Sequence, residues 1–375
     1  MALSRSPARI HSGGAAHMAT VAVAMSGGVD SAVAAALLAQ QGHRVFGLTL
    51  RLWSEEHGSG ATRENRCCSL ESVRDARRVC DLLDAPHYVL NVEDTFKEHI
   101  VDRFVAEYVA GRTPNPCVRC NQHIKFDALL SRALALGADF IATGHYARVE
   151  HDPNGGARLL RSCDRQKDQS YALCRLNQQQ LQRSLFPLGA LTKPQVRSLA
   201  EKFGIEIAEK PESQELCFVT SGSYRDFLRR QIPEHVAPGP IRHEDGRIVG
   251  GHTGLIDYTV GQRKGLGIAN TRPLYVTRLD VLNNTVVVGE AEHLERRELL
   301  ASGMHYVSST LPQEPMAVSV QVRAHAPEVG ARFLPLSGRR AQVTLDRPVR
   351  GIAPGQALVV YRDEEVIGAG DLTGD

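Results

Sequence analysis

The stretch VAVAMSGGVDSAVAAALLAQ, residues 21–40, decides the fold of this chain. Residues 21–25 form a short apolar run typical of a buried strand, and the helix formers of residues 32–41 follow a Ser-Gly-Gly turn. Gly42 stands where a helix end is expected. Glycines let backbone amides approach an anion, and a helix N-terminus adds a favourable dipole. Residues 26–31 therefore indicate a phosphate-binding loop.

The alternation of strand and helix continues beyond this loop. Further strands are predicted at residues 44–52, 87–92 and 140–143, and further helices at residues 69–83, 95–110 and 126–136. This order predicts an α/β fold with a mostly parallel, doubly wound sheet.

The pattern changes after about residue 219. Gly- and Pro-rich turns separate short β-like runs, and from about residue 287 short alternating segments such as 318–322, 341–345 and 357–361 indicate a small β-barrel. We therefore predict an N-terminal extension (1–18), a nucleotide-binding domain (19–219), a small central domain (220–286) and a C-terminal β-barrel (287–375).

Bulk composition narrows the class of protein. The 375 residues hold 44 Lys and Arg against 42 Asp and Glu, so the net charge of +2 neither suggests nor excludes a nucleic-acid partner. No apolar run approaches the roughly 18 residues that span a bilayer, so no membrane is expected. Eight unevenly spaced cysteines and the lack of a secretory apolar core indicate a reducing, cytoplasmic location. Residues 1–18 are either a disordered extension before a start at Met18 or a transit peptide.

The loop at residues 26–31 lacks the Lys of a Walker motif and the spacing of a dinucleotide fold. Its hydroxyls at Ser26 and Ser31 can donate to phosphate, and Asp30 can cap the helix or help to hold Mg²⁺. The whole string Ser-Gly-Gly-Val-Asp-Ser resembles the PP-loop of ATP pyrophosphatases, which cleave ATP between the α- and β-phosphates. A protein with only this string could still act on a small molecule.

Two separated cysteines suit sulfur transfer. Cys117 and Cys120 lie in the proline-marked stretch TPNPCVRCN, where a helix N-terminus and Arg119 should lower a thiol pKa. Cys217 lies far away in SQELCF, so one thiol could carry sulfur and another could resolve the persulfide. A zinc or iron–sulfur site at residues 117 and 120, completed by residue 67, 68 or 217, remains an alternative. The cysteines at 80, 163 and 174 are interpreted as small buried hydrophobes.

Several strings, in order along the chain, resemble the family of tRNA-specific 2-thiouridylases of the MnmA/TrmU type. They are residues 24–31, 113–126 (TPNPCVRCNQHIKF), 142–148 (ATGHYAR), 167–173 (KDQSYAL), 213–219 (SQELCFV) and 261–268 (GQRKGLGI). Other PP-loop enzymes would share only the first string.

The resemblance implies roles for individual residues. Cys120 would be the nucleophile, and Cys217 would carry the persulfide. The implied nucleotide site is Ala24, Met25, Ser26, Gly27, Gly28, Val29, Asp30, Ser31, Leu50 and Gly144. The implied tRNA contacts are the target-base segment Asn115, Pro116 and Cys117, with Lys167, Asp168, Gln169, His325 and Ala326. Many members have Asp at the position of Cys117, so no acid–base role is transferred to it.

The resemblance also implies a reaction. ATP and Mg²⁺ would activate wobble uridine 34 of a tRNA by adenylylation at the C2 oxygen. Sulfur from Cys217, supplied by a persulfide donor protein, would replace the adenylate, and a Cys120–Cys217 disulfide would remain. Two segments rich in arginine, 155–185 and 321–350, each hold six Lys or Arg against two acids, as phosphate-backbone binding requires. A non-enzymatic metal- or RNA-binding protein is a further alternative, which predicts no ATP turnover.

Overall fold

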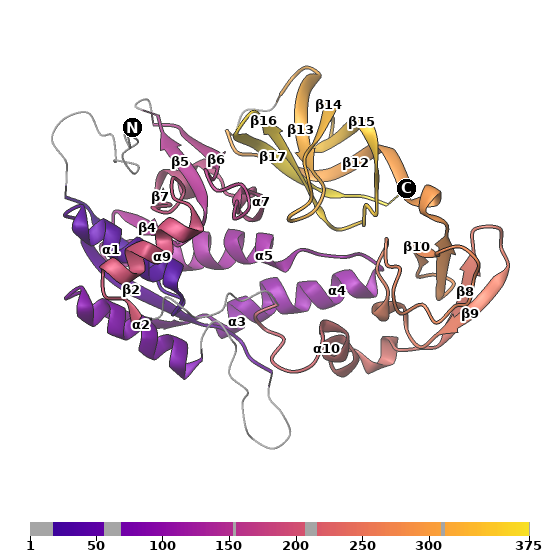
Figure 1. Cartoon of the computed structure of the whole chain (residues 1–375), viewed down its shortest axis with the longest axis horizontal. Helices are drawn as coiled ribbons and strands as arrows, with labels where there is room; N and C mark the ends of the chain where they lie inside the picture. The colour runs from indigo at the N-terminus through magenta and orange to yellow at the C-terminus, as the bar shows by residue number, and fades with distance from the viewer. Residues whose placement is uncertain (1–17, 56–68, 153–154, 207–215, 309–311, 375) are drawn as a thin grey trace.

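The computed structural model describes residues 18–55, 69–152, 155–206, 216–308 and 312–374 (Figure 1). The predicted extension before Met18 and the cysteines at positions 67 and 68 lie outside the described residues.

A parallel sheet forms the centre of the N-terminal domain. Its order is β3-β2-β1-β4-β7, and every neighbouring pair is parallel. The strands are β1 (Thr20–Ala24), β2 (Arg44–Arg51), β3 (His87–Asn91), β4 (Phe140–Ala142) and β7 (Ser184–Leu185). Along β1, Val21 and Val23 enter one buried cluster and Ala22 enters another, so both faces of the sheet are covered. The predicted doubly wound sheet is confirmed.

Helices cover the two faces of this sheet (Figure 1). One face carries α1 (Val29–Gln40), α2 (Leu70–Leu82) and α9 (Lys193–Lys202), and the other packs against the helical run that ends in α6 (Leu129–Ala135). The predicted helix at 95–110 consists of α3 (Glu93–Phe96), a π-helical segment η1 (Lys97–Asp102) and α4 (Arg103–Val109).

The helix predicted at 126–136 begins ten residues earlier than expected. It starts with α5 (Pro116–Arg119), continues as the π-helical η2 (Cys120–Ala128) and ends with α6. The side-chain oxygen of Asn115 accepts the N–H groups of Cys117 and Val118, and Pro116 occupies the first turn. An Asn cap followed by Pro is a strong start signal, which explains the earlier beginning. Two short helices follow, α7 (Ser170–Leu173) and α8 (Gln178–Gln182).

A small central unit follows the nucleotide-binding domain. It contains α10 (Tyr224–Gln231), the short 3₁₀ turns η4 (Pro233–His235) and η5 (Leu255–Asp257), and a sheet of order β10-β11-β8-β9. The strands are β8 (Gly239–His243), β9 (Ile248–His252), β10 (Tyr275–Asp280) and β11 (Thr285–Gly289). Their inward side chains form a separate buried cluster that includes Ile241, Val276 and Val286.

The C-terminal region is a closed antiparallel barrel of six strands, as predicted. The order β12-β15-β14-β13-β16-β17 closes through pairing of β12 with β17. After the turn η6 (Ala291–Leu294) come β12 (Glu295–Tyr306), β13 (Met316–Gln321), β14 (Val329–Leu336), β15 (Arg340–Arg350), β16 (Ala357–Arg362) and β17 (Glu365–Leu372). Closure leaves no unpaired sheet edge within the barrel.

A hairpin joins the barrel to the nucleotide-binding domain, and the sequence did not indicate it. Strands β5 (Ala147–His151) and β6 (Ala157–Arg161) pair with each other, and β6 pairs with β17 at Leu160 and Glu365. Side chains of both regions share one buried cluster, which contains Tyr171 and Tyr361. The barrel is therefore packed directly against the domain that holds the phosphate loop. No helix within the described ranges is long and apolar enough to cross a membrane.

Candidate nucleotide and sulfur-transfer site

The phosphate loop lies at the switch point of the parallel sheet. The chain runs from β1 outward to β2 and β3 and then returns to β4 on the other side of β1. Ligands of open α/β sheets bind where the strand order reverses, outside the carboxyl ends of the strands. Residues 25–28 follow β1 at that point and Gly144 follows β4. A Cβ at Gly144 would lie 2.7 Å from the backbone of Asp30 and Ser31, so only glycine fits there.

The loop is organised by its own hydroxyls and glycines. Ser31 Oγ donates to the Gly28 carbonyl at 3.0 Å and accepts the Ser26 N–H at 3.3 Å. Gly27 has a φ of +72°, and a Cβ there would lie 2.5 Å from the carbonyl oxygen of Ser72. Gly28 occupies the N-cap position of α1, and no side chain caps the helix. The first amides of α1 can therefore donate to a phosphate, which fits the predicted ATP site.

Asp30 is not the helix cap, which was one of its two predicted roles. Its carboxylate accepts hydrogen bonds from Tyr146 Oη at 2.8 Å and from Lys193 Nζ, 2.8 Å from both oxygens. Gly28 holds the cap position instead. No group of three His, Cys, Asp or Glu side chains in the described ranges could hold a metal ion. Mg²⁺ that accompanies ATP phosphates needs only one or two protein carboxylates, so the role of Asp30 in holding it stays a prediction.

Lys193 is a residue that sequence reasoning missed. It begins α9, is 7% exposed, and places a buried cation beside the phosphate loop. Its partner, Asp30, is 163 residues away in the sequence, so no local pattern connects the two. The only local signal is a Lys-Pro pair at a helix start, which is common in helices without any function.

Leu50 and Met25 lie on neighbouring strand ends beside the loop. Thr49 Oγ1 donates to the Met25 carbonyl at 2.9 Å and thereby ties the end of β2 to the end of β1. Leu50 is half-buried and packs against two core clusters. The structure thus brings the predicted nucleotide residues of β1, β2 and the loop after β4 to one edge of the sheet.

A buried histidine lies near the same edge. His145 is 8% exposed, its Nδ1 is 2.7 Å from Thr143 Oγ1, and its Nε2 is 3.4 Å from Lys125 Nζ. Burial, reinforced by the positive charge of Lys125, holds the pKa of His145 well below its usual range. The imidazole is therefore neutral at pH 7. The string ATGHYAR contains this residue, but its role was not predicted.

The predicted target-base segment, residues 115–117, is held from two sides. Asn115 caps α5, and the barrel contacts the preceding backbone. Gln356 Nε2 donates to the Thr113 carbonyl at 2.8 Å, and the Thr113 N–H donates to the Pro354 carbonyl at 2.8 Å. Pro116 is buried, whereas Cys117 is exposed. The segment therefore presents residue 117 to the surface on a fixed backbone.

Cys120 and Cys217 border the same apolar cluster. Both are half-buried and pack against a core that includes Phe96, Ile124 and Phe218. Cys120 is the first residue of η2, and π-helical turns are frequent at functional sites. The structure thus brings two cysteines from distant parts of the chain to one cluster. Residues 207–215, which include the start of the SQELCF string, lie outside the described residues.

The three cysteines interpreted as buried hydrophobes divide into two groups. Cys80 and Cys174 are buried, as predicted, and burial raises the pKa of their thiols to about 11 and about 12. Both thiols are therefore protonated and unreactive at pH 7. Cys163 is exposed, so its interpretation as a buried residue was wrong. It follows β6 in a polar loop, where no apolar layer covers it.

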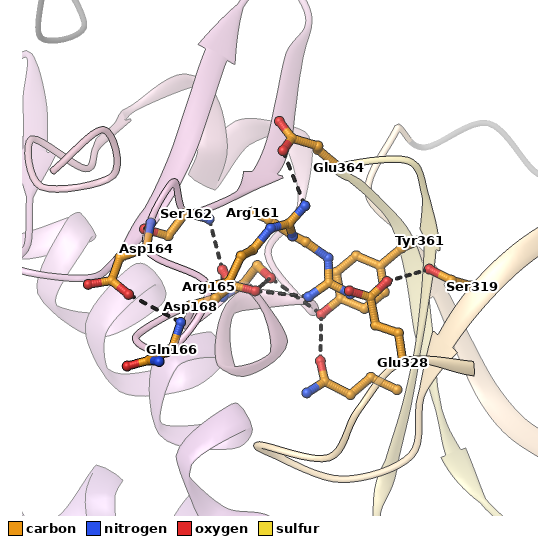
Figure 2. A network of polar contacts seen from close by, with 12 residues as sticks. Arg161, Ser162, Asp164, Arg165, Gln166, Asp168, Ser319, Glu328, Tyr361 and Glu364 are labelled. Carbon is orange, nitrogen blue, oxygen red and sulfur yellow. Dashed lines mark hydrogen bonds and ion pairs between the residues drawn. The ribbon is translucent and has the colours of Figure 1, made fainter. Parts of the chain in front are cut away.

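The predicted tRNA contact Asp168 lies inside a buried ion-pair network (Figure 2). Its carboxylate pairs with Arg161 at 3.0 Å and accepts hydrogen bonds from the backbone of Ser162 and the hydroxyl of Ser170. Arg161 also pairs with Glu328 of the barrel at 2.8 Å and stacks on Tyr361. The Asp168 side chain is 7% exposed. This network joins the barrel to the nucleotide-binding domain.

The other predicted tRNA contacts have varied surroundings. Gln169 is engaged within the protein, because its Oε1 accepts the Tyr146 N–H at 2.9 Å. Lys167 is half-buried next to it. His325 is exposed on the loop between β13 and β14, with a φ of +60°, and the Ala326 N–H donates to the Arg323 carbonyl. Asp168 and Gln169 thus orient the loop, and the segment around His325 is accessible.

The two arginine-rich segments differ in their pairing. In residues 155–185, four arginines pair with carboxylates of the barrel: Arg158 with Glu365, Arg161 with Glu328, Arg165 with Glu364, and Arg175 with Asp371. This segment therefore faces the barrel, and its local charge excess is largely neutralised within the protein. In residues 321–350, Arg323, Arg332 and Arg347 are exposed and form no ion pair with any described residue.

The fold and the loop at the switch point define a PP-loop protein of the HUP class. Models of three consecutive domains match the chain: the tRNA methyl transferase HUP domain over residues 19–221, the tRNA methyl transferase PRC-barrel domain over 225–290, and the aminomethyltransferase beta-barrel domain over 296–372.

Similar proteins narrow this class to one family. The tRNA-specific 2-thiouridylase MnmA of Moorella thermoacetica is 50% identical over 93% of this chain and 98% of its own length. MnmA of Heliobacterium modesticaldum is 49% identical over 94% of this chain and 92% of its own length. MnmA of Roseiflexus castenholzii is 47% identical over 96% of this chain and 100% of its own length. The chain belongs to the tRNA-specific 2-thiouridylase MnmA family.

Proposed function

We propose that this chain is a tRNA-uridine 2-sulfurtransferase. In the proposed reaction, ATP activates wobble uridine 34 at the C2 oxygen, and sulfur from a cysteine persulfide gives 2-thiouridine, AMP and pyrophosphate. One observation carries the proposal: an uncapped PP-loop helix stands at the switch point of the sheet in a chain whose Cys120 and Cys217 border one cluster. Membership of the 2-thiouridylase family supplies the substrate class.

The nucleotide would bind across the ends of β1 and β4. In the proposal, the α1 amides and the hydroxyls of Ser26 and Ser31 bind phosphate oxygens, and Gly144 allows close approach. Lys193, whose Nζ is held beside the phosphate loop by Asp30, would stabilise the negative charge of the departing pyrophosphate. Mg²⁺ would arrive with ATP and neutralise phosphate charge, and Asp30 is the carboxylate of the loop that would help to hold it.

The chemistry would proceed in two stages. First, uridine O2 attacks the α-phosphorus, the bond to the bridging oxygen of the β-phosphate breaks, and pyrophosphate leaves with the electron pair. Second, the Cys120 thiolate attacks Sγ of the Cys217 persulfide, which releases the outer sulfur as sulfide and forms a Cys120–Cys217 disulfide. The sulfide attacks C2 of the activated uridine, and AMP leaves. A cellular thiol must then reduce the disulfide before the next turnover.

The partners follow from this reaction. The substrate is the anticodon region of a tRNA, and the target base must leave its stack to reach the site. A persulfide-carrying donor protein must reload Cys217. Because the reaction needs reduced cysteines and a tRNA substrate, we expect it in the cytoplasm.

The test is sulfur incorporation into unmodified tRNA. Purified protein, ATP, Mg²⁺, a persulfide source and the tRNA are incubated, and digested tRNA is examined for 2-thiouridine by mass spectrometry. We expect 2-thiouridine only with ATP, and none from Cys120→Ser or Cys217→Ser. Cys174→Ser is a matched control, because that thiol is buried in a different cluster and should be dispensable. If wild-type protein converts ATP to AMP but thiolates no tRNA, a small-molecule substrate replaces this proposal.

A further inference from the structure

A cavity of about 360 Å³ lies between the nucleotide-binding domain and one end of the barrel. The nucleotide-binding domain contributes residues of α4 and of the stretch 112–119, and the barrel contributes the loop at Gly355 and the C-terminal end of β17. Neither the phosphate loop nor the Cys120–Cys217 cluster supplies any of its lining residues. The cavity is therefore a separate feature of the molecule.

Its charged lining consists of four arginines and two acids. Glu107 is shared by Arg112 at 2.5 Å and Arg103 at 3.2 Å. Asp371 is shared in the same way, by Arg175 at 2.7 Å and Arg119 at 3.8 Å. Each carboxylate thus faces two guanidinium groups, and each guanidinium carries five N–H donors. The lining has a charge of about +2 and a surplus of hydrogen-bond donors, so its chemistry selects an anion.

Burial strengthens the attraction of these positive charges and donors for an anion, because water screens them less. The side chains of Glu107, Arg175 and Arg119 are 8%, 11% and 25% exposed, whereas those of Arg103 and Arg112 are about half exposed. Burial lowers the pKa of Arg119; Asp371 opposes this shift, and Arg103 and Arg175 add to it. The cationic groups therefore repel one another inside the cavity, and a bound anion would relieve that repulsion.

The cavity adjoins the predicted target-base segment. Pro114 and Asn115 belong to its lining, and Asn115 starts the helix that leads to Cys120. The barrel completes the cavity from the other side, where a Cβ at Gly355 would lie 3.0 Å from Arg112 Cβ. An anion held here would thus sit beside the residues expected to receive the uridine.

We propose that this cavity binds a backbone phosphate of the RNA strand next to the modified uridine. The inference rests on the proposed function and adds a positioning subsite to it. Planar guanidinium groups bind phosphate oxygens in pairs, which suits a phosphodiester. The half-exposed Arg103 and Arg112 would contact a strand that enters and leaves the cavity. Free pyrophosphate carries the same kind of phosphate oxygens and could also bind arginines. In the proposed reaction, however, it is released at the phosphate loop, which supplies no residue to the cavity.

Binding of unmodified tRNA, without ATP or sulfur donor, tests the subsite. The variants Arg103→Gln and Arg112→Gln each leave Glu107 one guanidinium partner, so both should fold. We expect each to weaken tRNA binding about five- to tenfold at about 0.1 M salt. The slope of log K against log salt should become shallower by about 0.7 for each phosphate of single-stranded RNA that the variant no longer neutralises. Affinity for pyrophosphate alone should stay unchanged.

Arg158→Gln is the matched control. Its side chain is 54% exposed, similar to that of Arg103, and the substitution removes the same charge. Arg158 pairs with two carboxylates, Glu150 and Glu365, outside the cavity. Equal weakening by Arg158→Gln, or unchanged salt slopes in both cavity variants, would overturn the subsite. A loss of pyrophosphate binding in the cavity variants would assign the site to the leaving group instead.

Failure of the subsite and failure of the proposed function give different results. If wild-type protein makes 2-thiouridine and the cavity variants bind tRNA as tightly as it does, only the subsite is wrong. If wild-type protein binds tRNA with the expected change in the variants but makes no 2-thiouridine, the subsite stands and the sulfur-transfer reaction is wrong.

Discussion

Two ion pairs, each with a buried cation beside a tyrosine ring, differ in what surrounds them. At the phosphate loop, Lys193 pairs with Asp30 and its Nζ lies 5.7 Å from the centre of the Tyr146 ring. At the barrel contact, Arg161 pairs with both Asp168 and Glu328 and lies 3.4 Å from the centre of the Tyr361 ring.

The two ion pairs differ in their exposure to solvent and in the number of anionic partners of the cation. Asp30 is 31% exposed, so an incoming phosphate can compete with it for Lys193. Arg161 and Asp168 are 5% and 7% exposed, and Arg161 already has two anionic partners (Figure 2). The first pair can rearrange around a ligand, whereas the second is suited to hold two domains together. From this difference in exposure we expect the first pair to serve chemistry and the second to serve architecture.

The strongest test of the architectural role is the stability of Arg161→Met. Removing the guanidinium leaves the carboxylate of Asp168 buried without its charge partner, which typically costs about 3–5 kcal/mol. Urea unfolding of the variant should show that decrease. Arg165→Gln, which breaks an exposed pair with Glu364, should cost less than about 1 kcal/mol. Equal effects from the two variants would remove the architectural role of Arg161.

A second effect concerns activity and comes from Lys193→Met. Loss of a preorganised cation at a phosphate typically reduces the rate about 10²–10³-fold. The free energy of unfolding should fall by only about 1 kcal/mol, because Asp30 is partly solvated. Initial rates of AMP formation and urea unfolding measure the two quantities. Lys202→Met, at the other end of α9, is the control. If Lys193→Met lost as much unfolding free energy as Arg161→Met but kept its rate of AMP formation, Lys193 would have an architectural role and no catalytic one.

A more modest effect is expected from Gly144→Ala. The added Cβ would lie 2.7 Å from the Asp30 and Ser31 backbone, so the loop or α1 must shift, at a typical cost of about 1–3 kcal/mol. The shift should raise the KM for ATP about tenfold, measured in the AMP assay. Gly156→Ala is a control for the added methyl, because its φ is not in the left-handed region and the nearest atom, Asp152 Cβ, would lie 3.6 Å away, an ordinary contact. An unchanged KM would mean that the loop tolerates movement.

Local signals explain which parts could be predicted. The strand–loop–helix unit at residues 21–40, the alternating strands and the barrel segments depend on contacts within a few residues or on simple periodicity, and their structural prediction was correct. Phosphate binding by the loop stays a prediction. The Asn115 cap lies in the sequence, but the proline-rich stretch was interpreted as a loop entering a later helix. Lys193, the β5–β6 hairpin contact and the pairing of Arg175 with Asp371 depend on residues far apart in the chain. Charge counting along residues 155–185 missed such pairs because the compensating acids lie in the barrel.

The subtlest effect concerns pH and the neutral His145 beside the phosphate loop. Burial and Lys125 hold its folded-state pKa well below its ordinary value of 6.5. The unfolded chain therefore binds a proton more readily, so the stabilising contribution is fully present above about pH 6.5 and is lost as pH falls below it. One such group contributes a slope of at most about 1.4 kcal/mol per pH unit. His145→Gln should flatten the dependence of the unfolding free energy on pH between about 6.5 and about 5 relative to wild type.

His235→Gln, at an exposed site, is the control for the His-to-Gln substitution itself in this measurement. Equal slopes in wild type and His145→Gln would mean that the imidazole is accessible to protons. His145 lies beside the phosphate loop. Solvent would then reach this edge of the sheet at His145 as well as at Asp30, in contrast to the buried Arg161 network. A flattened slope would instead show that His145 is protected from protons in the folded protein, which would confine the solvent-accessible part of the loop edge to Asp30 and Lys193 themselves.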